Sequence, residues 1–446
     1  MKASSTLLSA LVALLVTAVA SADDVSTLTP AVDDMESPQA LSRDASRVYA
    51  AAKGSLFQVR VLTSTGRSLA TAGSGFMVGD NGLAITNYHV VAKLVTDPKR
   101  YVAEVIDTAG QRDDITVLKI DVLHDLALIR INKQRGWPAL RISSKTLKQG
   151  ERLYSIGNPL DLGFAISEGS FNGLITRPYY PQILFSGAIN SGMSGGPAVD
   201  GSGAVVGVNV SKRLDGEQIS FLVPAKFVTA LIEQGKTVAA QPTQLEFRRD
   251  IGQQLQAHQN TMADQLLKAP LSTRLLGDYR APINETQGIR CWGDDSSQPQ
   301  LKYRYSRLTC HMESNVMVEE AFHTGFIAVR HEYFATDQLD SFRFLQFYSR
   351  AYRNETFGNF RHRHWTGPEC NDAFIKGDGS QNVPIRAVLC ARASRKFDGL
   401  YEFGLVAATV DDTQSGLHTR VDISGVTLEN GQRIVHAFLD AIERRQ

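Results

Sequence analysis

The segment Gly-Met-Ser-Gly-Gly-Pro at residues 192–197 has the composition that a nucleophilic serine requires. A serine that attacks a carbonyl carbon must stand on a tight turn, with neighbouring N–H groups aimed at the oxyanion that forms. The glycines around Ser194 permit such a turn, because glycine adopts backbone conformations that other residues avoid. Taken alone, the segment could also be an ordinary surface loop. An apolar run at 204–210, typical of a strand, follows the segment. The exposed edge of a strand in this place could bind a protease substrate by pairing with its backbone.

A serine nucleophile also needs a base and a group that orients the base, and two candidates lie upstream. His89 begins the segment after a predicted strand that ends at Thr86, and Asp125 opens the apolar run at 126–131. An isolated histidine is usually structural, and an aspartate before a strand is usually a turn residue. Asp125 is the carboxylate that could be buried against the imidazole of His89. We expect the adjacent His124, which could look like a rival base, to face solvent.

Together these segments resemble the trypsin-like serine proteases, most closely the HtrA (Deg) branch. The matching stretches are Gly-Ser-Gly-Phe at 73–76, Thr-Asn-Tyr-His-Val-Val at 86–91, Asp-Leu-Ala-Leu-Ile at 125–129, Ile-Gly-Asn-Pro at 156–159, Ser-Glu-Gly at 167–169, Gly-x-Ser-Gly-Gly at 192–196 and Ile-Ser-Phe-Leu-Val-Pro at 219–224. They follow the family's order of histidine, aspartate and serine. The resemblance implies two six-stranded β-barrels with the active site in the cleft between them.

The resemblance also implies a role for each residue. Ser194 would attack the scissile carbonyl, His89 would take its proton and pass it to the leaving amine, and Asp125 would hold the imidazole tautomer. The backbone N–H groups of Gly192 and Ser194, aided by Met193, would form the oxyanion hole. This chemistry needs no metal and no organic cofactor.

The sequence departs from the family at two places. Met193 stands where digestive relatives have aspartate and HtrA relatives usually have asparagine, so an ion pair to a freshly cut N-terminus is not available. Activity would then depend on the order of the loop, and an inactive resting state is compatible with the sequence. No PDZ pattern follows the protease segment.

The primary specificity pocket is also suggested by the resemblance. It places Ala188 near the base of the pocket, with Ile189 and the run Val208, Asn209 and Val210 along its walls. None of these side chains is charged. We therefore expect a preference for small or medium apolar side chains at the residue before the scissile bond, although Lys212 and Arg213 lie close in sequence.

The elements around these residues change character along the chain. Short β-branched runs, about ten residues apart, continue from 46 to 232 and predict a mainly β region. The segment 245–267 is polar, with apolar residues at helical spacing, and predicts a helix. Strand patterns return after Pro270, and 431–445 predicts a terminal helix.

We therefore expect a mainly β chain in five parts. They are a signal peptide at 1–22, a flexible lead-in at 23–45, a chymotrypsin-like double-barrel protease domain at 46–236, a helical connector at 237–270, and a separate α+β domain at 271–446 whose ligand the sequence does not name. In the last part, His362 and His364 could share one face of a strand and bind a metal. No third ligand is evident, so an exposed polar strand or loop is the favoured interpretation.

The N-terminus has the pattern of an export signal. Lys2 precedes an apolar stretch at 7–20, and Ala-Ser-Ala at 20–22 is a typical cleavage site. The alternative, a membrane anchor, is disfavoured because the stretch is short and lacks a following basic stop signal. We expect an exported protein, periplasmic or secreted, with no stable membrane insertion. The sequons at Asn284 and Asn354 would matter only in a eukaryotic secretory host.

The four cysteines, Cys291, Cys310, Cys370 and Cys390, agree with export, because disulfides persist in oxidising compartments. We favour the local pairs Cys291–Cys310 and Cys370–Cys390, which close short loops. A zinc site is the weaker alternative, because no Cys-x-x-Cys spacing occurs.

The leading functional hypothesis is an exported serine endopeptidase acting on proteins or peptides, in quality control or on a dedicated substrate. A net charge of +1, from 47 basic and 46 acidic side chains, gives no argument for nucleic acid. The alternatives are a protease-like scaffold or chaperone, and an enzyme with one natural target, which could be its own lead-in or residues 235–244. HtrA relatives commonly trimerise, but residues that would build a homo-oligomer are not identifiable here.

Overall fold

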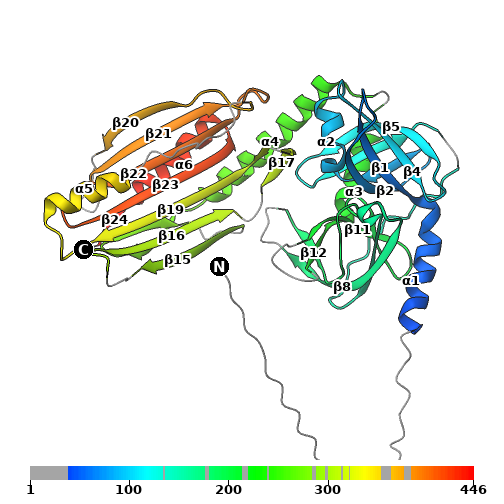
Figure 1. Ribbon diagram of the computed structural model, residues 1–446, viewed down its shortest axis with the longest axis horizontal. Helices are drawn as coiled ribbons and strands as arrows, with labels where there is room; N and C mark the ends of the chain where they lie inside the picture. The colour runs from blue at the N-terminus through cyan, green and yellow to red at the C-terminus, as the bar shows by residue number, and fades with distance from the viewer. Residues whose placement is uncertain are drawn as a thin grey trace, which may run out of the picture. The chain divides into compact units, whose positions relative to one another are not determined.

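Two closed antiparallel barrels of six strands each form the first half of the structure, a computed structural model of the chain (Figure 1). The first barrel has the order β1-β2-β3-β6-β5-β4, and the second has the order β10-β11-β12-β9-β8-β7. Their strands are β1 (Leu56–Thr63), β2 (Leu69–Met77), β3 (Leu83–Thr86), β4 (Tyr101–Asp107), β5 (Arg112–Asp121), β6 (Leu126–Ile131), β7 (Arg152–Gly157), β8 (Ala165–Ile175), β9 (Gln182–Phe185), β10 (Pro197–Asp200), β11 (Val205–Lys212) and β12 (Ser220–Pro224). The predicted double barrel is confirmed.

The structure describes residues 39–133, 136–175, 180–212, 219–238, 241–283, 288–296, 300–312, 315–320, 322–352, 363–375 and 383–445, without the side chains of 39–42 and 211–212. The predicted signal peptide, most of the lead-in, Arg213, His362 and the two sequons lie outside these ranges. Within them, no helix is both long and apolar enough to cross a membrane.

Three helices and two short 3₁₀ turns accompany the barrels. They are α1 (Gln39–Ala52), α2 (Tyr88–Thr96), α3 (Ala225–Gly235), η1 (Lys53–Ser55) and η2 (Pro159–Asp161). The predicted flexible lead-in at 23–45 is wrong for its last residues, because helix α1 begins at Gln39. This segment contains no proline or glycine, and Val48 and Ala52 lie one turn apart and pack into the apolar cluster that includes Tyr154.

A long helix leads into the second half of the structure. Helix α4 (Gln244–Leu266) confirms the helix predicted over 245–267. It begins at a capping box in which the Thr243 hydroxyl accepts from the Glu246 N–H and the Glu246 carboxylate accepts from the Thr243 N–H. Its buried residues reach two different hydrophobic cores, one of the first barrel and one of the C-terminal sheet.

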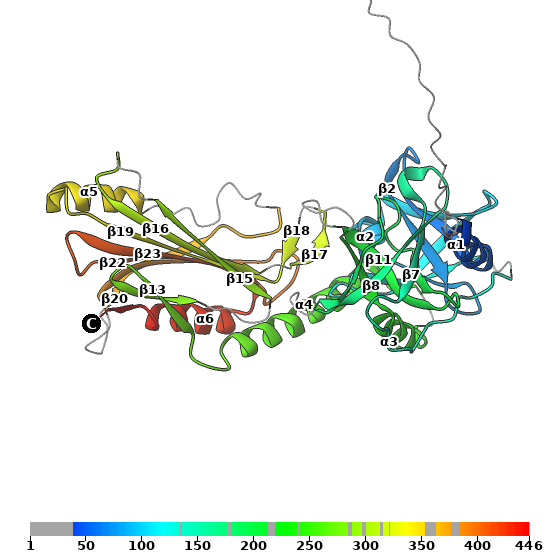
Figure 2. The same ribbon diagram turned by 90° about the horizontal axis from the view of Figure 1, so that it is seen from below.

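The C-terminal part is built on a seven-stranded sheet in the order β15-β16-β19-β23-β22-β21-β20. Figure 2 shows α5 on one face of this sheet and α6 on the other. The elements are β13 (Ser272–Leu276), β14 (Tyr279–Ile283), β15 (Ile289–Ser296), β16 (Arg304–Met312), β17 (Val316–Glu319), β18 (Phe322–Thr324), β19 (Phe326–Ala335), α5 (Ser341–Ala351), β20 (Glu369–Ile375), β21 (Ile385–Ala393), β22 (Tyr401–Thr409), β23 (Ser415–Val426), α6 (Leu428–Asp440) and β24 (Glu443–Arg444). The predicted α+β character of this half is confirmed.

The terminal helix is displaced from its predicted range of 431–445. It begins earlier because the Thr427 hydroxyl accepts from the Asn430 N–H and caps the first turn. It ends at Asp440 because Glu443 and Arg444 pair with β14 as an added strand. Backbone hydrogen bonds to another segment therefore replace the last predicted turn.

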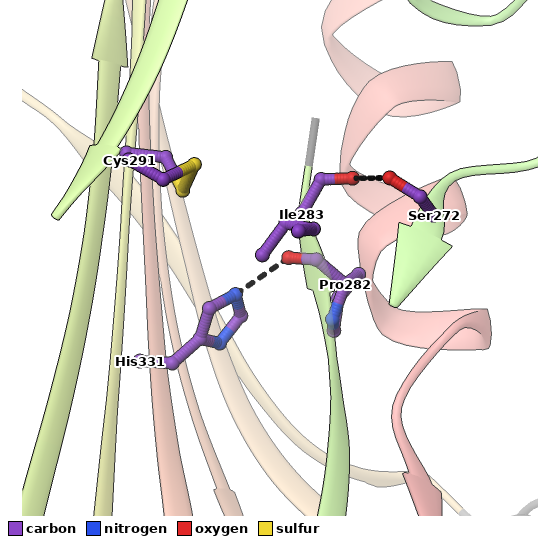
Figure 3. The surroundings of a disulfide bond; sticks show 6 residues. Ser272, Pro282, Ile283, Cys291 and His331 are labelled. Carbon is purple, nitrogen blue, oxygen red and sulfur yellow. Dashed lines mark hydrogen bonds between the residues drawn. A yellow bond between two sulfur atoms is a disulfide. The ribbon is translucent and has the colours of Figure 1, made fainter. Parts of the chain in front are cut away.

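Both edge strands of the seven-stranded sheet are cross-linked to their neighbours. Cys291 of β15 is bonded to Cys310 of β16, and Cys370 of β20 is bonded to Cys390 of β21, at directly paired positions. These are the two local pairs favoured from the sequence, and the zinc alternative is wrong. Figure 3 shows the first bond beside β14, where the buried His331 Nε2–H donates to the Pro282 carbonyl at 2.7 Å.

Loss of an edge disulfide should weaken the sheet measurably. The Cys291–Cys310 bond closes a loop with a sequence separation of 19, for which the expected stabilisation is about 3 kcal/mol. The double variant Cys291→Ala/Cys310→Ala should therefore unfold at a lower urea concentration, followed by circular dichroism. Ser296→Ala, on the same strand, should unfold at the wild-type midpoint. An unchanged midpoint in the double variant would contradict this expectation.

Candidate active site

His89 and Asp125 lie side by side in the structure. The imidazole Nδ1 is 2.6 Å from one carboxylate oxygen of Asp125, and the backbone N–H of His89 donates to the other oxygen at 2.8 Å. Asp125 sits between β5 and β6 with φ +55°, a conformation uncommon for residues other than glycine. The Asn87 side-chain amide donates to its carbonyl at 2.7 Å and helps to hold that turn. The two residues are therefore fixed relative to each other at both backbone and side chain.

The environment of His89 changes its protonation. Burial of the ring lowers its pKa, but the negative charge of Asp125 and the hydrogen bond to it raise the pKa, and the net direction is upward from the ordinary value of 6.5. The hydrogen bond at Nδ1 places the ring's other nitrogen, Nε2, away from Asp125. In the neutral imidazole, Nε2 is then the acceptor that can take a proton.

Ser194 stands on a turn between β9 and β10 that glycines make possible. Gly192 has φ +92° and Gly195 has φ +86°. A Cβ added at Gly195 would lie only 2.3 Å from the Ser74 carbonyl oxygen, so a side chain does not fit there. A Cβ added at Gly73 would meet both the Val90 side chain and the Ser194 carbonyl, which places the serine backbone next to the residue after His89.

The Ser194 hydroxyl donates to the carbonyl of Val210 at 3.2 Å. The structure thus brings His89 and Asp125 into direct contact, and it turns the serine hydroxyl to a backbone acceptor on β11. Catalytic hydrogen bonds are often long or poorly aligned in substrate-free sites. A serine hydroxyl changes its acceptor by rotation about one side-chain bond.

The loop before Ser194 leaves two N–H groups without acceptors. The Ser191 carbonyl accepts from the Leu160 N–H at 2.9 Å, and the Gly192 carbonyl accepts from the Ser74 hydroxyl at 2.7 Å. The Met193 N–H donates to the Asn190 carbonyl at 3.0 Å, so Met193 is not an available donor, contrary to our expectation. Among the residues that the structure describes, no acceptor binds the N–H groups of Gly192 and Ser194. The expectation that these two groups form the oxyanion hole stays a prediction that this geometry allows.

Comparison with known proteins agrees with this geometry. Residues 73–208 match the family described as the trypsin-like peptidase domain. The two barrels form a trypsin-like peptidase domain of the HtrA branch.

Similar proteins include "Serine protease HTRA2, mitochondrial" of Drosophila persimilis, 34% identical over 175 residues. "Serine protease HTRA3" of Homo sapiens is 33% identical over 174 residues, and "Probable periplasmic serine endoprotease DegP-like" of a Marinomonas species is 31% identical over 178 residues. Each match covers 37% of this chain and 39%, 38% and 35% of the respective relative. The match therefore spans less than two fifths of each relative's length.

In this peptidase domain, Met193 anchors the nucleophile loop by packing. Its side chain is 2% exposed and lies in the apolar core of the second barrel, where Phe185 and Leu222 also pack. A Cβ added at Gly157 would lie 2.6 Å from the Met193 Cα, so the loop is pressed directly onto β7. Burial of an apolar side chain here takes the place of the ion pair that an aspartate would make.

The structure corrects most of the predicted specificity pocket. Ile189 and Val208 are buried in the hydrophobic cores, and Ala188 is exposed. Asn209 is buried and donates to the Ile156 and Met193 carbonyls, which makes it a support of the loop. Val210 alone of the five lines the open cleft. A β-bulge follows Asn209, and Val210 is only partly buried, at the edge of the core that contains Val208.

The cleft beside His89 has a volume of about 890 Å³ and is lined from both halves of the chain. The peptidase domain contributes His89, Asp125 and Val210, and the C-terminal part contributes Met317, Glu319 and His323 from β17 and β18. Sequence reasoning missed this second wall, because nothing local indicates that residues so far along the chain return to the site.

His124 also lines the cleft. We expected this side chain to face solvent, but it is largely covered. Its side chain is 14% exposed, its Nδ1 is 2.6 Å from the Asp121 carboxylate, and its ring stacks on Phe227 of α3 with centroids 3.6 Å apart. His364, of the proposed metal pair, is buried and stacked on Phe322. In the described ranges, no cluster of histidine, cysteine or carboxylate side chains is arranged to hold a metal ion.

Ser74 is a further residue whose importance the sequence did not reveal. Its N–H donates to the Ser194 carbonyl at 2.7 Å, its hydroxyl donates to the Gly192 carbonyl, and that hydroxyl accepts from the Asn158 N–H at 2.9 Å. It is fully buried on β2 of the first barrel and touches the nucleophile loop of the second. The motif at 73–76 contains this residue, but the motif alone does not identify its partners.

The raised pKa of His89 can be measured directly. We expect the ring resonances of His89 to titrate with a pKa above 6.5 in the wild-type protein, followed by NMR and assigned with His89→Gln. In Asp125→Asn the charge that raises the pKa is lost while the burial that lowers it remains, so the pKa should fall. A wild-type pKa at or below 6.5, or no change in Asp125→Asn, would show that the carboxylate does not control the imidazole.

Proposed function

We propose that this chain is an exported serine endopeptidase that hydrolyses peptide bonds in proteins through an acyl-enzyme intermediate. The observation that carries the proposal is the combination of the His89–Asp125 pair with the two unoccupied N–H groups at Gly192 and Ser194. A base oriented by a carboxylate and a pair of donors beside one serine are the components that acyl transfer needs.

In the proposed mechanism, the Ser194 Oγ attacks the scissile carbonyl carbon as the His89 Nε2 takes its proton. The oxyanion of the tetrahedral intermediate accepts from the N–H groups of Gly192 and Ser194. His89 then gives the proton to the leaving amine, and the acyl-enzyme remains. Water, deprotonated by the same imidazole, repeats the attack and releases the acid product and the free serine. Asp125 stabilises the imidazolium in both steps.

Export to the periplasm or the outside of the cell is supported by three features. The first residues have the pattern of a signal peptide, and both disulfides of the C-terminal sheet fit an oxidising compartment. One similar protein is described as a periplasmic endoprotease. Substrates would be proteins or peptides, taken in quality control or as one dedicated target that the C-terminal part helps to select.

A second candidate function is a protease-like scaffold that binds proteins without cleaving them. The observation that favours it is the Ser194 hydroxyl, which donates to Val210 instead of to His89. The formed pair of free N–H groups favours the enzyme, because a collapsed loop would turn a carbonyl into that position.

Labelling with a fluorophosphonate probe tests the proposed function. The mature protein should be labelled at Ser194, because only an activated serine beside a formed oxyanion hole attacks the probe at a useful rate. Ser194→Ala is the control and should remain unlabelled. Absence of labelling on folded wild-type protein would favour the scaffold, and equal labelling of both proteins would place the reaction elsewhere.

The link through Ser74 predicts a loss of activity without a loss of fold. Ser74→Ala removes the donor to the Gly192 carbonyl and leaves the loop freer to turn, so kcat should fall roughly tenfold to a hundredfold. Turnover of a fluorogenic peptide measures this, with circular dichroism as the test of folding. Ser68→Ala, in an exposed turn before β2, is the matched control and should keep wild-type turnover. Wild-type kcat in Ser74→Ala would contradict the assignment.

A further inference from the structure

The segments that carry His89 and Asp125 are both held from outside the two barrels. Helix α2 begins at Tyr88, one residue before the histidine, and the turn that ends at Asp125 follows β5. Each segment contacts elements that lie after the last barrel strand in the sequence. These contacts concern the proposed catalytic pair directly, so we consider them one at a time.

Tyr88 connects the pair to the hairpin of β17 and β18. Its N–H donates to the Asp125 carbonyl at 3.1 Å, and its hydroxyl donates to the Val318 carbonyl at 2.7 Å. The side chain is 0% exposed, and burial together with the charges of Glu319 and Asp125 raises its pKa, so the hydroxyl stays protonated. A buried hydroxyl without a hydrogen-bond partner is unfavourable, so this bond restrains the position of Tyr88.

Helix α4 holds the segment before Asp125 in a similar way. The side-chain amide of Gln254 accepts from the Val122 N–H at 2.9 Å and donates to the Ile120 carbonyl at 2.9 Å. One helical side chain thus pairs with two backbone groups of the turn, as a neighbouring strand would. Asp250, one turn earlier on α4, forms an ion pair with Lys119 at 2.8 Å.

The apolar core beneath these bonds is continuous. The cluster that contains Val91 and Val95 of α2 also contains three residues of α4 and three of the hairpin. The added residues are Phe247, Ile251, Leu255, Val316, Val318 and Phe322. Because α2 is buried on this side by residues outside the barrels, its position depends on them.

We infer that Tyr88 and Gln254 are positioning residues, through which β17 and helix α4 hold the His89–Asp125 pair in its working geometry. This inference rests on the proposed function and adds to it a role for the C-terminal half. The hairpin that receives the Tyr88 hydroxyl also lines the cleft with Met317 and Glu319. A substrate that contacts this wall of the cleft therefore contacts the hairpin that binds Tyr88, the residue before His89.

The exposed ion pair between Lys93 of α2 and Glu320 does not carry the inference. Its oxygen and nitrogen are 2.9 Å apart, but the Glu320 side chain is 78% exposed. Ion pairs of this kind contribute little to stability. The buried hydrogen bonds of Tyr88 and Gln254 are the specific connections.

Two variants of the full chain test the inference. Tyr88→Phe removes one hydroxyl at constant shape, and Gln254→Ala removes both bonds to the turn. In each, kcat for a fluorogenic peptide should fall roughly tenfold or more while KM changes less than twofold, because the pair is displaced and the binding cleft remains. Gln253→Ala is the matched control, since Gln253 is exposed on the same helix, and it should behave as wild type.

The pH profile separates positioning from a general loss of stability. If the contact between His89 and Asp125 loosens, the charge that raises the histidine pKa acts more weakly, and the acid limb of kcat/KM should move to lower pH. Lowered stability alone would reduce the active fraction without moving this limb. Wild-type kcat and an unmoved limb in both variants would overturn the inference.

A second readout does not require turnover. The Nδ1–H of His89, hydrogen-bonded to Asp125, should give a far-downfield NMR signal that Asp125→Asn removes. This signal should broaden or shift in Tyr88→Phe and Gln254→Ala and stay unchanged in Gln253→Ala. If the wild-type protein fails to react with the fluorophosphonate probe, the proposed function fails. The Nδ1–H signal still decides whether Tyr88 and Gln254 hold the His89–Asp125 pair. An identical signal in all four proteins would refute their positioning role.

Discussion

The proposed nucleophile, Ser194, and its proposed base, His89, belong to different barrels, and the hydrogen bonds of Ser74 link the two barrels at the site. From β2 of the first barrel, this one residue binds the Ser194 carbonyl, the Gly192 carbonyl and the Asn158 N–H of the second. The two carbonyl contacts hold peptide planes of the loop that carries Ser194. Because a peptide plane carries the C=O of one residue and the N–H of the next, the N–H groups of Gly192 and Ser194 point where the carbonyls of Ser191 and Met193 allow. The Ser191 carbonyl accepts from the Leu160 N–H at 2.9 Å and the Met193 carbonyl accepts from the Asn209 side chain at 3.2 Å, and Ser74 holds the peptide planes next to these.

The same loop depends on a buried methionine instead of a buried charge. An aspartate at this position needs a cationic partner, because an unpaired charge in a protein interior is costly. Met193 needs only apolar neighbours, and Phe185 and Leu222 supply them. An anchor of this kind is present as soon as the second barrel has folded, and it requires no cleavage of the chain to create a partner. Packing thus sets the loop geometry in this chain.

The sequence predicted what depends on local geometry and missed what depends on distant neighbours. Gly192 and Gly195 could be recognised because a tight turn around a serine demands glycine wherever it occurs. The partial burial of His124 could not be recognised, because it depends on Phe227 and Asp121, and Phe227 lies about a hundred residues away in sequence. The resemblance placed Val208, Asn209 and Val210 together along the pocket wall, but Val208 and Asn209 are fully buried and only Val210 lines the cleft. The order of the seven-stranded sheet was equally inaccessible, since β19 pairs with β23 across a long stretch of chain.

The C-terminal half is built in a way that suits a positioning role. A group that holds a catalytic residue must itself be held to within a fraction of an ångström. The sheet behind the hairpin is cross-linked at both edges, by Cys291–Cys310 and by Cys370–Cys390, and edge strands are where a sheet most readily frays. The hairpin of β17 and β18 is a separate two-stranded sheet, but Phe326 of β19 follows it almost directly, and the Gly325 N–H between them donates to the Ser424 carbonyl of β23 at 3.0 Å. A flexible domain in the same place could still bind a substrate, but it could not keep the Val318 carbonyl at hydrogen-bonding distance from Tyr88. The hairpin thus connects the C-terminal half, through Tyr88, to the segment that carries the imidazole.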